Sequence, residues 1–170
     1  GDAGIYLRGT PQVQVWDTSR RDVGAEVGSS GLYNNQSHAS KPLVLADNAI
    51  GDWNNFRIIM VGDQVTVYLN GVLVVDKVPL ENYWDRSLPL FTEEQIELQA
   101  HGNIIEYRDI YIREIPAAKL SVLSEQEIKD NFKMLFDGSS LHEWVGNKTA
   151  YIIEDGNIAV YPKRGGDGNL

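Results

Sequence analysis

The chain has 170 residues, a hydrophobic fraction of 42% and no cysteine. This length and composition predict one folded domain with its own core, and the lack of cysteine excludes disulfides, thiolate catalysis and cysteine metal sites. The formal net charge of −9 argues against nucleic acid as a partner, and no apolar run approaches the ~20 residues of a membrane-spanning helix.

A β-hairpin is predicted at the start of the chain. Residues 5–8 form a short strand in which Tyr6 and Arg8 share one face. A tight return at 9–11 then leads into a second strand over 12–17. We expect this hairpin to bring Arg8 close to the polar face of the second strand.

The second strand carries a combination of side chains that is typical of sugar binding. Gln12, Gln14 and Trp16 share one of its faces, and Asp17 stands at its end. Carboxamides hydrogen-bond sugar hydroxyls, and an indole covers the apolar face of a pyranose. For Asp17 the pattern leaves three roles open: base, metal ligand or turn cap.

The middle of the chain contains two long loops and the clearest strand signal. Residues 18–52 are predicted to form a long irregular loop, in which we expect His38 to be solvated. Strands at 56–61, 64–69 and 72–76, joined by Gly62-Asp63 and Asn70-Gly71 turns, predict a meander. In the loop over 77–94, Trp84 follows Tyr83 and is either a sugar platform or a plug at a sheet edge.

Residues 95–102 carry acid–base groups on one face of a predicted strand. Glu97, Gln99 and His101 alternate with apolar residues, so their side chains project together, about 7 Å apart. A solvated outer face is the alternative. Beyond this strand we predict a long strand over 104–115, a capped helix over 124–132, and strands at 150–154 and 157–162. Together these elements predict an all-β fold, an antiparallel sandwich with one short helix.

Several motifs together resemble one family. The chain resembles the 3-keto-disaccharide hydrolase family, of the kind found in Bacteroidetes, in the order and spacing of six motifs. These motifs are residues 4–9 (GIYLRG), 13–17 (VQVWD), 51–54 (GDWN), 67–71 (VYLNG), 96–102 (IELQAHG) and 107–112 (YRDIYI). It implies a concanavalin A-like lectin/glucanase jelly roll with its site on a concave face. It also implies a periplasmic, secreted or cell-surface location and an activity on glycosides oxidised at C3.

The resemblance also predicts how the chain is organised. Residues 1–116 resemble the later two-thirds of such a jelly roll, and 117–130 form a linker with the short helix. Residues 131–170, with KMLFDGSSLHEW at 133–144, resemble the start of a second module or the permuted completion of the first. About one hairpin of the sandwich is then missing, and an open sheet edge favours a homo-oligomer or strand exchange.

A ketone at C3 acidifies the C2 proton, so such a site needs a base, a stabiliser of the enolate oxygen and hydroxyl clamps. His101 suits the base because imidazole ordinarily titrates near pH 6.5, and Glu97 could replace it or orient it. Arg8 or a divalent cation could polarise the ketone. The predicted catalytic residues are His101, Glu97 and Asp17, and the predicted substrate-binding residues are Arg8, Gln14, Gln99, Trp16, Tyr6 and Trp84.

Two other interpretations remain open. A non-catalytic carbohydrate-binding module would use the same amides and aromatic rings, since fold does not decide function. A structural module for surface assembly predicts that the polar residues do not converge. A classical glucanase is disfavoured because it needs paired carboxylates, and the 12–17 strand offers amides.

Overall fold

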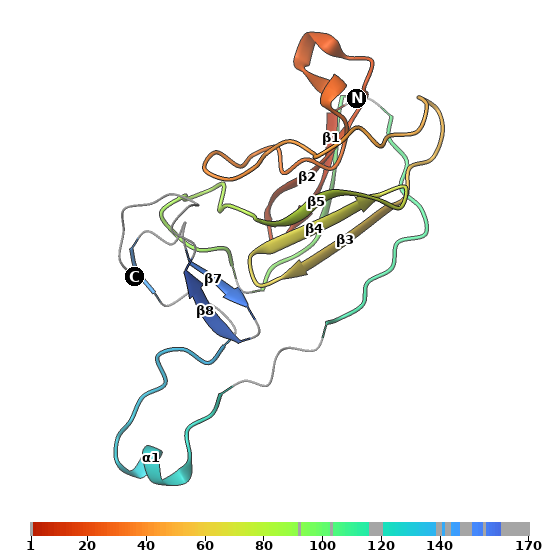
Figure 1. Cartoon of the computed structure of the whole chain (residues 1–170). Helices are drawn as coiled ribbons and strands as arrows, with labels where there is room; N and C mark the ends of the chain where they lie inside the picture. Colours follow the sequence, from red (N-terminus) through yellow and green to blue (C-terminus); the bar gives the residue numbers. More distant parts are fainter. Residues whose placement is uncertain are drawn as a thin grey trace.

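The computed structural model describes residues 2–91, 93–102, 104–115, 121–138, 141, 144–146, 151–154 and 156–160. Its regular secondary structure is almost entirely β-strand, as the sequence predicts, and long loops connect the strands (Figure 1). The first sheet is antiparallel and has the strand order β2-β1-β6. Its strands are β1 (Asp2–Leu7), β2 (Thr10–Trp16) and β6 (Glu97–His101). The hairpin and the later strand predicted from alternation are therefore confirmed.

The second sheet is the predicted meander, with the order β3-β4-β5. Its strands are β3 (Phe56–Val61), β4 (Gln64–Leu69) and β5 (Val72–Pro79). Asn70 and Gly71 join β4 to β5 with φ of 51° and 83°. Those values suit the two-residue hairpin turn for which Asn-Gly is the strongest signal.

The core lies between the two sheets. Leu7, Val13 and Leu32 contribute from the side of the first sheet, and β4 and β5 supply most of the rest. Leu32 forms a bridge to Val13, so the segment around it extends the first sheet beyond β2. Beside β5, Leu43 donates its backbone N–H to Val74. The chain between residues 32 and 43 therefore closes this side of the two sheets.

One carboxylate organises the loops at this closed side. Glu81 accepts hydrogen bonds from the backbone N–H groups of Gln36, Ser37 and His38, at 2.7–2.9 Å. It also pairs with the His38 imidazole at 3.0 Å and with the Arg86 guanidinium at 2.7 Å. The expectation that His38 is solvated is wrong, because its side chain is almost buried against Glu81.

The prediction of a long strand over 104–115 is also wrong. This segment is extended but pairs with no strand among the described residues, and most of its apolar side chains are exposed: Ile104, Ile110, Tyr111, Ile112 and Ile115. Tyr107 donates its hydroxyl to the Gln99 carbonyl, and Arg108 lies over the Trp53 ring. The segment therefore leaves β6 and passes toward the start of β3 without a strand to pair with. β propensity alone does not form a strand.

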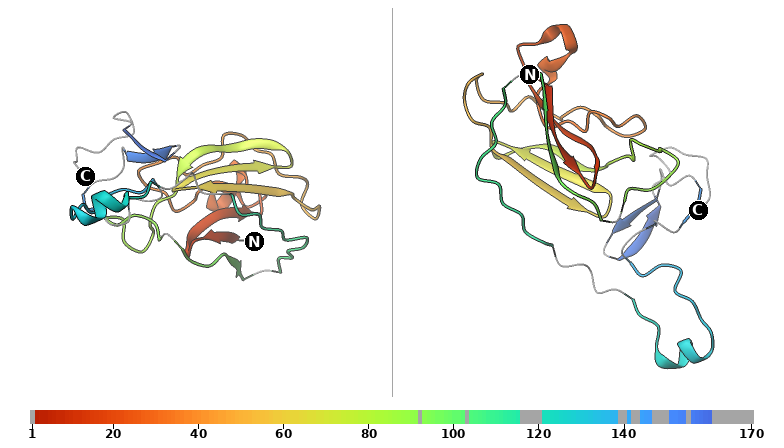
Figure 2. Two further views of the ribbon diagram at one scale, coloured as in Figure 1. Left: turned by 90° about the horizontal axis from the view of Figure 1, so that it is seen from below. Right: turned by 180° about the vertical axis from the view of Figure 1, so that it is seen from behind.

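Of the remaining elements, the short helix lies apart from the two sheets, whereas a second hairpin lies beside the β3–β4 turn, where Ile153 is close to Gly62 (Figure 2). Helix α1 (Glu125–Lys129) begins with the predicted capping box, in which Ser124 and Glu127 satisfy each other's backbone N–H groups. Strands β7 (Tyr151–Glu154) and β8 (Asn157–Val160) pair as a hairpin. The predicted ends of these strands beyond 160 fall outside the described residues. The predicted long loop over 18–52 contains two short 3₁₀ helices, η1 (Arg21–Val23) and η2 (Ala25–Val27).

We predict that Glu81→Gln lowers the free energy of unfolding by about 2–3 kcal/mol at pH 7, because charged hydrogen bonds are lost. Burial raises the pKa of Glu81, but the backbone donors of Gln36, His38 and Ser37 outweigh this effect and hold the pKa below the usual value for glutamate. Because the pKa of Glu81 is lower in the folded state than in the unfolded state, its charge stabilises the fold at pH values above the unfolded-state pKa. This contribution is lost as the pH falls through the folded-state pKa.

Urea denaturation from about pH 7, where carboxylates are ionised, down to about pH 3, where most are protonated, checks this prediction. The difference between wild type and Glu81→Gln should shrink as the pH falls below the usual carboxylate range. Glu106→Gln, at an exposed position, is the matched control. A difference that stays constant with pH would contradict the role assigned to the Glu81 charge.

Candidate functional site

The first sheet has one polar face, and its register places the predicted residues in rows. Asp2 lies between Trp16 and His101, and Gly4 lies between Gln14 and Gln99. Farther along β1, Tyr6 is opposite Glu97. Cross-strand partners project on the same side of a sheet. The polar side chains that the alternation predicts on β2 and on β6 therefore share one surface, which we call the polar face.

The centre of this face is a buried chain of amides. Gln12 donates its Nε2–H to Oε1 of Gln14, whose side chain is 0% exposed. Nε2 of Gln14 donates in turn to Oδ1 of Asp2 at 2.7 Å and to the Ala3 carbonyl at 3.0 Å. The prediction that Gln14 binds substrate is not supported, because its amide is buried and occupied. Its contacts make it a support for Asp2.

Gly4 leaves the space that the amide chain fills. A Cβ atom at this position would lie 2.7 Å from both Cδ and Oε1 of Gln12. Carbon atoms do not approach so closely without displacement of one of them. Glycine at the middle of β1 therefore allows the Gln12 carboxamide to lie over the sheet.

Asp2 stands beside His101 and was missed by the sequence reasoning. Oδ2 of Asp2 lies 3.5 Å from Nδ1 of His101, and the imidazole is 72% exposed. A carboxylate next to one ring nitrogen orients the ring and leaves the other nitrogen free to accept a proton. The alternation of Asp2, Gly4 and Tyr6 could have indicated this position, but only the pairing of β1 with β6 places it next to His101.

Glu97 occupies a separate part of the polar face. It is four positions from His101 on β6, which is about 13 Å along a strand. The expectation that Glu97 orients His101 is therefore wrong, and Asp2 holds that place. Burial raises the pKa of Tyr6, and the charge of Glu97 raises it further. The Tyr6 phenol consequently stays protonated and can donate a hydrogen bond.

Gln99 lies between these two ends of the face. Its Oε1 atom is buried and has no hydrogen-bond partner among the described residues. A buried acceptor without a donor costs about 1–3 kcal/mol. Because this oxygen is closed to solvent, a sugar hydroxyl does not reach it in this conformation, and the binding role of Gln99 stays a prediction.

Arg8 and Asp17 lie outside the rows. Arg8 is in the β1–β2 turn with a φ of 50°. Burial lowers its pKa, and the charge of Asp63 in the β3–β4 turn partly offsets this. The expectation that Arg8 faces Gln12 and Gln14 is therefore wrong, because the strand alternation ends before it. Asp17 accepts hydrogen bonds from the hydroxyl and backbone of Ser19, which lower its pKa, so it caps a turn.

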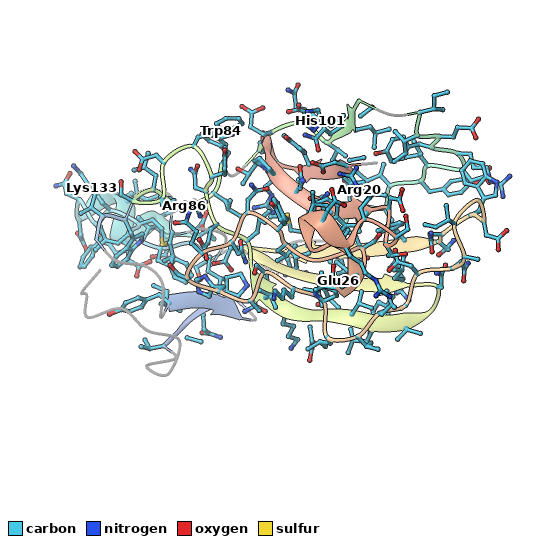
Figure 3. The ribbon with its side chains drawn as sticks, turned by 90° about the horizontal axis from the view of Figure 1, so that it is seen from above. Arg20, Glu26, Trp84, Arg86, His101 and Lys133 are labelled. Atoms are coloured by element: carbon cyan, nitrogen blue, oxygen red, sulfur yellow. The ribbon has the colours of Figure 1, made fainter. Side chains whose placement is uncertain are left out.

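Aromatic side chains stand at both ends of the polar face. Trp16 packs edge-on against Tyr33, with ring centroids 5.4 Å apart. Trp84 donates its indole N–H to the Gly9 carbonyl at 2.7 Å and packs against Tyr83. Figure 3 shows Trp84 and His101 along the same side of the molecule. Trp84 is exposed and anchored at the hairpin turn, which is compatible with either predicted role.

The comparison with known families agrees with this surface. The family model for the 3-keto-alpha-glucoside-1,2-lyase-like domain matches residues 1–113, which is well over half of the chain. The chain belongs to this family. No curated protein matches it significantly, and no solved structure does. The matched range includes both sheets and the unpaired segment as far as residue 113.

A divalent cation has few ligands available in this lyase-like domain. Asp2 and His101 could supply two, but Glu97 is too distant to be a third. The described residues contain no group of three or more such side chains placed for a metal ion. Asp2 and His101 alone do not form a site for a divalent cation.

In the described part of the chain, no helix has the length and apolar character needed to cross a membrane.

We predict that Gly4→Ala lowers the free energy of unfolding by about 1–3 kcal/mol, because the new methyl group overlaps the Gln12 carboxamide. Chemical denaturation of the single and double variants checks this. The same substitution in a Gln12→Ala background should cost less, since the amide has been removed. Equal costs in the two backgrounds would show that the Gln12 side chain does not fill this space.

Proposed function

We propose that this domain cleaves glycosides oxidised at C3, with His101 as the general base. The observation that carries the proposal is the Asp2–His101 pair on the polar face of a 3-keto-glucoside lyase-like domain. The carboxylate is held by the Gln14 amide, so the imidazole has a defined neighbour although it is exposed. A general base is the first of the groups that the chemistry requires.

The chemistry proceeds through the carbon next to the ketone. His101 removes the proton from C2, and the electron pair is delocalised onto the C3 oxygen as an enolate. The enolate then re-forms the ketone as the C1–C2 double bond forms and the C1–O bond breaks. The leaving oxygen takes a proton from the protonated His101 imidazole and departs as an alcohol, which returns the base to its neutral form. Water can add to the unsaturated sugar afterwards, which gives net hydrolysis, or the unsaturated sugar is the final product.

Other residues of the polar face bind the substrate. The side chain of Gln99 is about 7 Å from that of His101 along β6, so one sugar ring can contact both. Trp16 offers a flat apolar surface in the same row as Asp2. We include in this proposal the concanavalin A-like jelly roll and a periplasmic, secreted or cell-surface location, which the family resemblance supports.

A carbohydrate-binding module without catalysis is the second candidate. Two observations favour it: His101 is largely exposed, and Glu97 lies about 13 Å from it, too far to act on the same atom. Amides and aromatic rings suffice for binding sugars. This candidate predicts saturable binding of unoxidised glycosides and no release of the aglycone.

We predict that wild-type protein releases the aglycone from methyl 3-keto-glucoside but not from methyl glucoside, because only the ketone acidifies C2. His101→Ala should lower the rate by at least about 100-fold, the usual contribution of a general base. Asp2→Asn should lower it by about tenfold, since the imidazole loses its carboxylate neighbour. Product chromatography, with and without a chelator, measures these rates.

Asp76→Asn is the matched control, because Asp76 is an exposed carboxylate on β5. It should leave the rate unchanged. Retained turnover in His101→Ala would remove His101 from the mechanism. Saturable binding of methyl glucoside, with no release from either compound, would favour the binding module. A rate that falls on chelation in wild type would add a cation to the site.

We further propose that the unpaired segment 104–115 associates with a second copy of the chain. β6 is an edge strand of the first sheet, and both Ile96, just before it, and Leu98, within it, are exposed. Unpaired backbone and exposed apolar residues at an edge favour strand addition. The segment and the edge belong to the same chain, so a symmetric exchange satisfies both in two copies at once.

We predict that Ile112→Lys weakens self-association, because it places a charge in the exchanged strand. Light scattering at increasing protein concentration should show dimers for wild type and monomers for this variant. Val122→Lys is the matched control, since Val122 is as exposed as Ile112 and lies outside the segment. A wild type that stays monomeric, or an equal effect of the two variants, would contradict the exchange.

A further inference from the structure

The polar face carries negative charge where the proposed chemistry creates more of it. Its three strands place two carboxylates there, Asp2 and Glu97, beside the His101 imidazole. An enolate oxygen is stabilised by a hydrogen-bond donor or a cation close to the base. Arg8 lies outside the rows, and Tyr6 is opposite Glu97, about 13 Å from His101 along the sheet. A donor that reaches His101 from outside the sheet would offset this charge.

The open edge of β6 is the place where such a donor can enter. β6 is the last strand of the first sheet, and Leu98 on its apolar side is exposed because no further strand covers it among the described residues. The Gln99 carbonyl accepts a hydrogen bond from the Tyr107 hydroxyl at 2.9 Å, so segment 104–115 already supplies a donor to β6. A strand added at this edge would lie about 4.8 Å from β6 and next to His101.

Residues 109–113 have the alternation that this edge requires. Asp109, Tyr111 and Arg113 alternate with two exposed apolar residues, Ile110 and Ile112. β6 likewise has its polar residues at odd positions and its apolar residues at even positions. When odd positions lie opposite odd positions, the added strand extends the polar face and also covers the apolar side of β6.

Charge selects one register among these. In an antiparallel pairing with position 111 opposite position 99, Arg113 lies opposite Glu97. Asp109 then lies opposite His101, whose imidazole becomes positive when it takes the C2 proton. Both pairs join opposite charges, which stabilises a cross-strand pair. A shift of two positions in either direction separates both pairs.

A second copy of the chain can supply this strand more readily than the same chain can. In the same chain the segment leads away from β6, with Arg108 4.0 Å from the centroid of the Trp53 ring, and Figure 1 shows it running outside both sheets. If it folded back tightly on β6, position 104 would lie opposite His101. That slip by one position would turn Ile110 and Ile112 onto the polar face.

We propose that the partner's Tyr111 completes the catalytic site in an exchanged dimer, where its hydroxyl donates a hydrogen bond to the enolate oxygen. The proposal rests on the proposed function and on the exchange. In the selected register the partner's Tyr111 is opposite Gln99, about 7 Å along the strand from His101. A sugar ring whose C2 lies at His101 can direct its C3 oxygen toward that hydroxyl. The partner's Arg113 offsets the charge of Glu97.

Tyr111→Phe tests the donor because it removes only the hydroxyl. Release of methanol from methyl 3-keto-glucoside should fall about 100-fold, the usual cost of losing one oxyanion donor. The loss should be in kcat rather than KM, and light scattering should still show a dimer. Tyr68→Phe, in the second sheet, is the matched control and should retain the rate. An unchanged rate in Tyr111→Phe would overturn the proposal.

Mixed dimers show whether Tyr111 acts across the interface. His101→Ala and Tyr111→Phe are unfolded together and refolded, with wild type treated in the same way as the reference. Half of the dimers should then be mixed, and one site in each combines an intact imidazole with an intact phenol. Recovery of about a quarter of the wild-type rate is therefore expected. A mixture as inactive as its two components would place Tyr111 in the site of its own chain and reject the partner's role.

Engineered cysteines test the register without any turnover, because the chain has no cysteine of its own. Leu98→Cys combined with Ile112→Cys places two thiols opposite each other in the selected register, within reach of a disulfide. Oxidation should give covalent dimers on a non-reducing gel. Leu98→Cys combined with Val122→Cys is the control, since Val122 is as exposed as Ile112. Covalently closed monomers, or equal dimer yields from the two combinations, would overturn the register.

The two kinds of measurement separate this inference from the proposed function. Covalent dimers from the Ile112 combination, with no release of methanol by wild type, would retain the shared face and reject both the function and the hydroxyl's role in it. Release by wild type that Tyr111→Phe does not change would retain the function and reject the donor.

Discussion

The chain of buried amides from Gln12 through Gln14 to Asp2 is the constraint on which the site depends. Two carboxamides that water cannot reach must satisfy each other, because an unpaired buried polar group costs about 1–3 kcal/mol. Their donors and acceptors form a sequence that ends at the only charged member, Asp2. The buried part of the polar face therefore fixes a carboxylate next to an exposed imidazole, and an exposed ion pair alone would not.

This arrangement combines a buried, rigid support with an accessible imidazole. Gln14 is fully buried, whereas His101 is open to solvent. A base that must meet a sugar from solution has to be exposed, and its orientation has to come from residues that are not. Loops complete the surface, and the Glu81 carboxylate stabilises those on the closed side by taking backbone N–H groups that would otherwise lack partners.

Strand alternation and turn chemistry predict much of this fold but not the register between distant strands. The Asn70-Gly71 turn and the shared face of Glu97, Gln99 and His101 follow from local pattern. The neighbours Asp2 and His101 are 99 positions apart, so no local pattern relates them. Arg8 departs from its predicted face because the chain turns there, and alternation applies only while the strand continues.

Two other differences between the predicted and the observed structure also depend on residues that are distant in the sequence. His38 is in a polar loop, but its partner Glu81 is 43 positions away, and burial comes from that pairing. Residues 104–115 have the composition of a strand, but the part of the chain that the structure describes offers them no neighbouring strand to receive their hydrogen bonds. Propensity describes one segment, whereas a sheet is a property of two.

The space at Gly4 has a consequence for how this family can change over time. A side chain at that position requires a smaller residue in place of Gln12, whose loss leaves Gln14 without its donor and Asp2 with a less constrained neighbour. Single replacements along this path pass through destabilised proteins. We therefore expect these four positions to be inherited as a set, and relatives that differ at one of them to differ at the others.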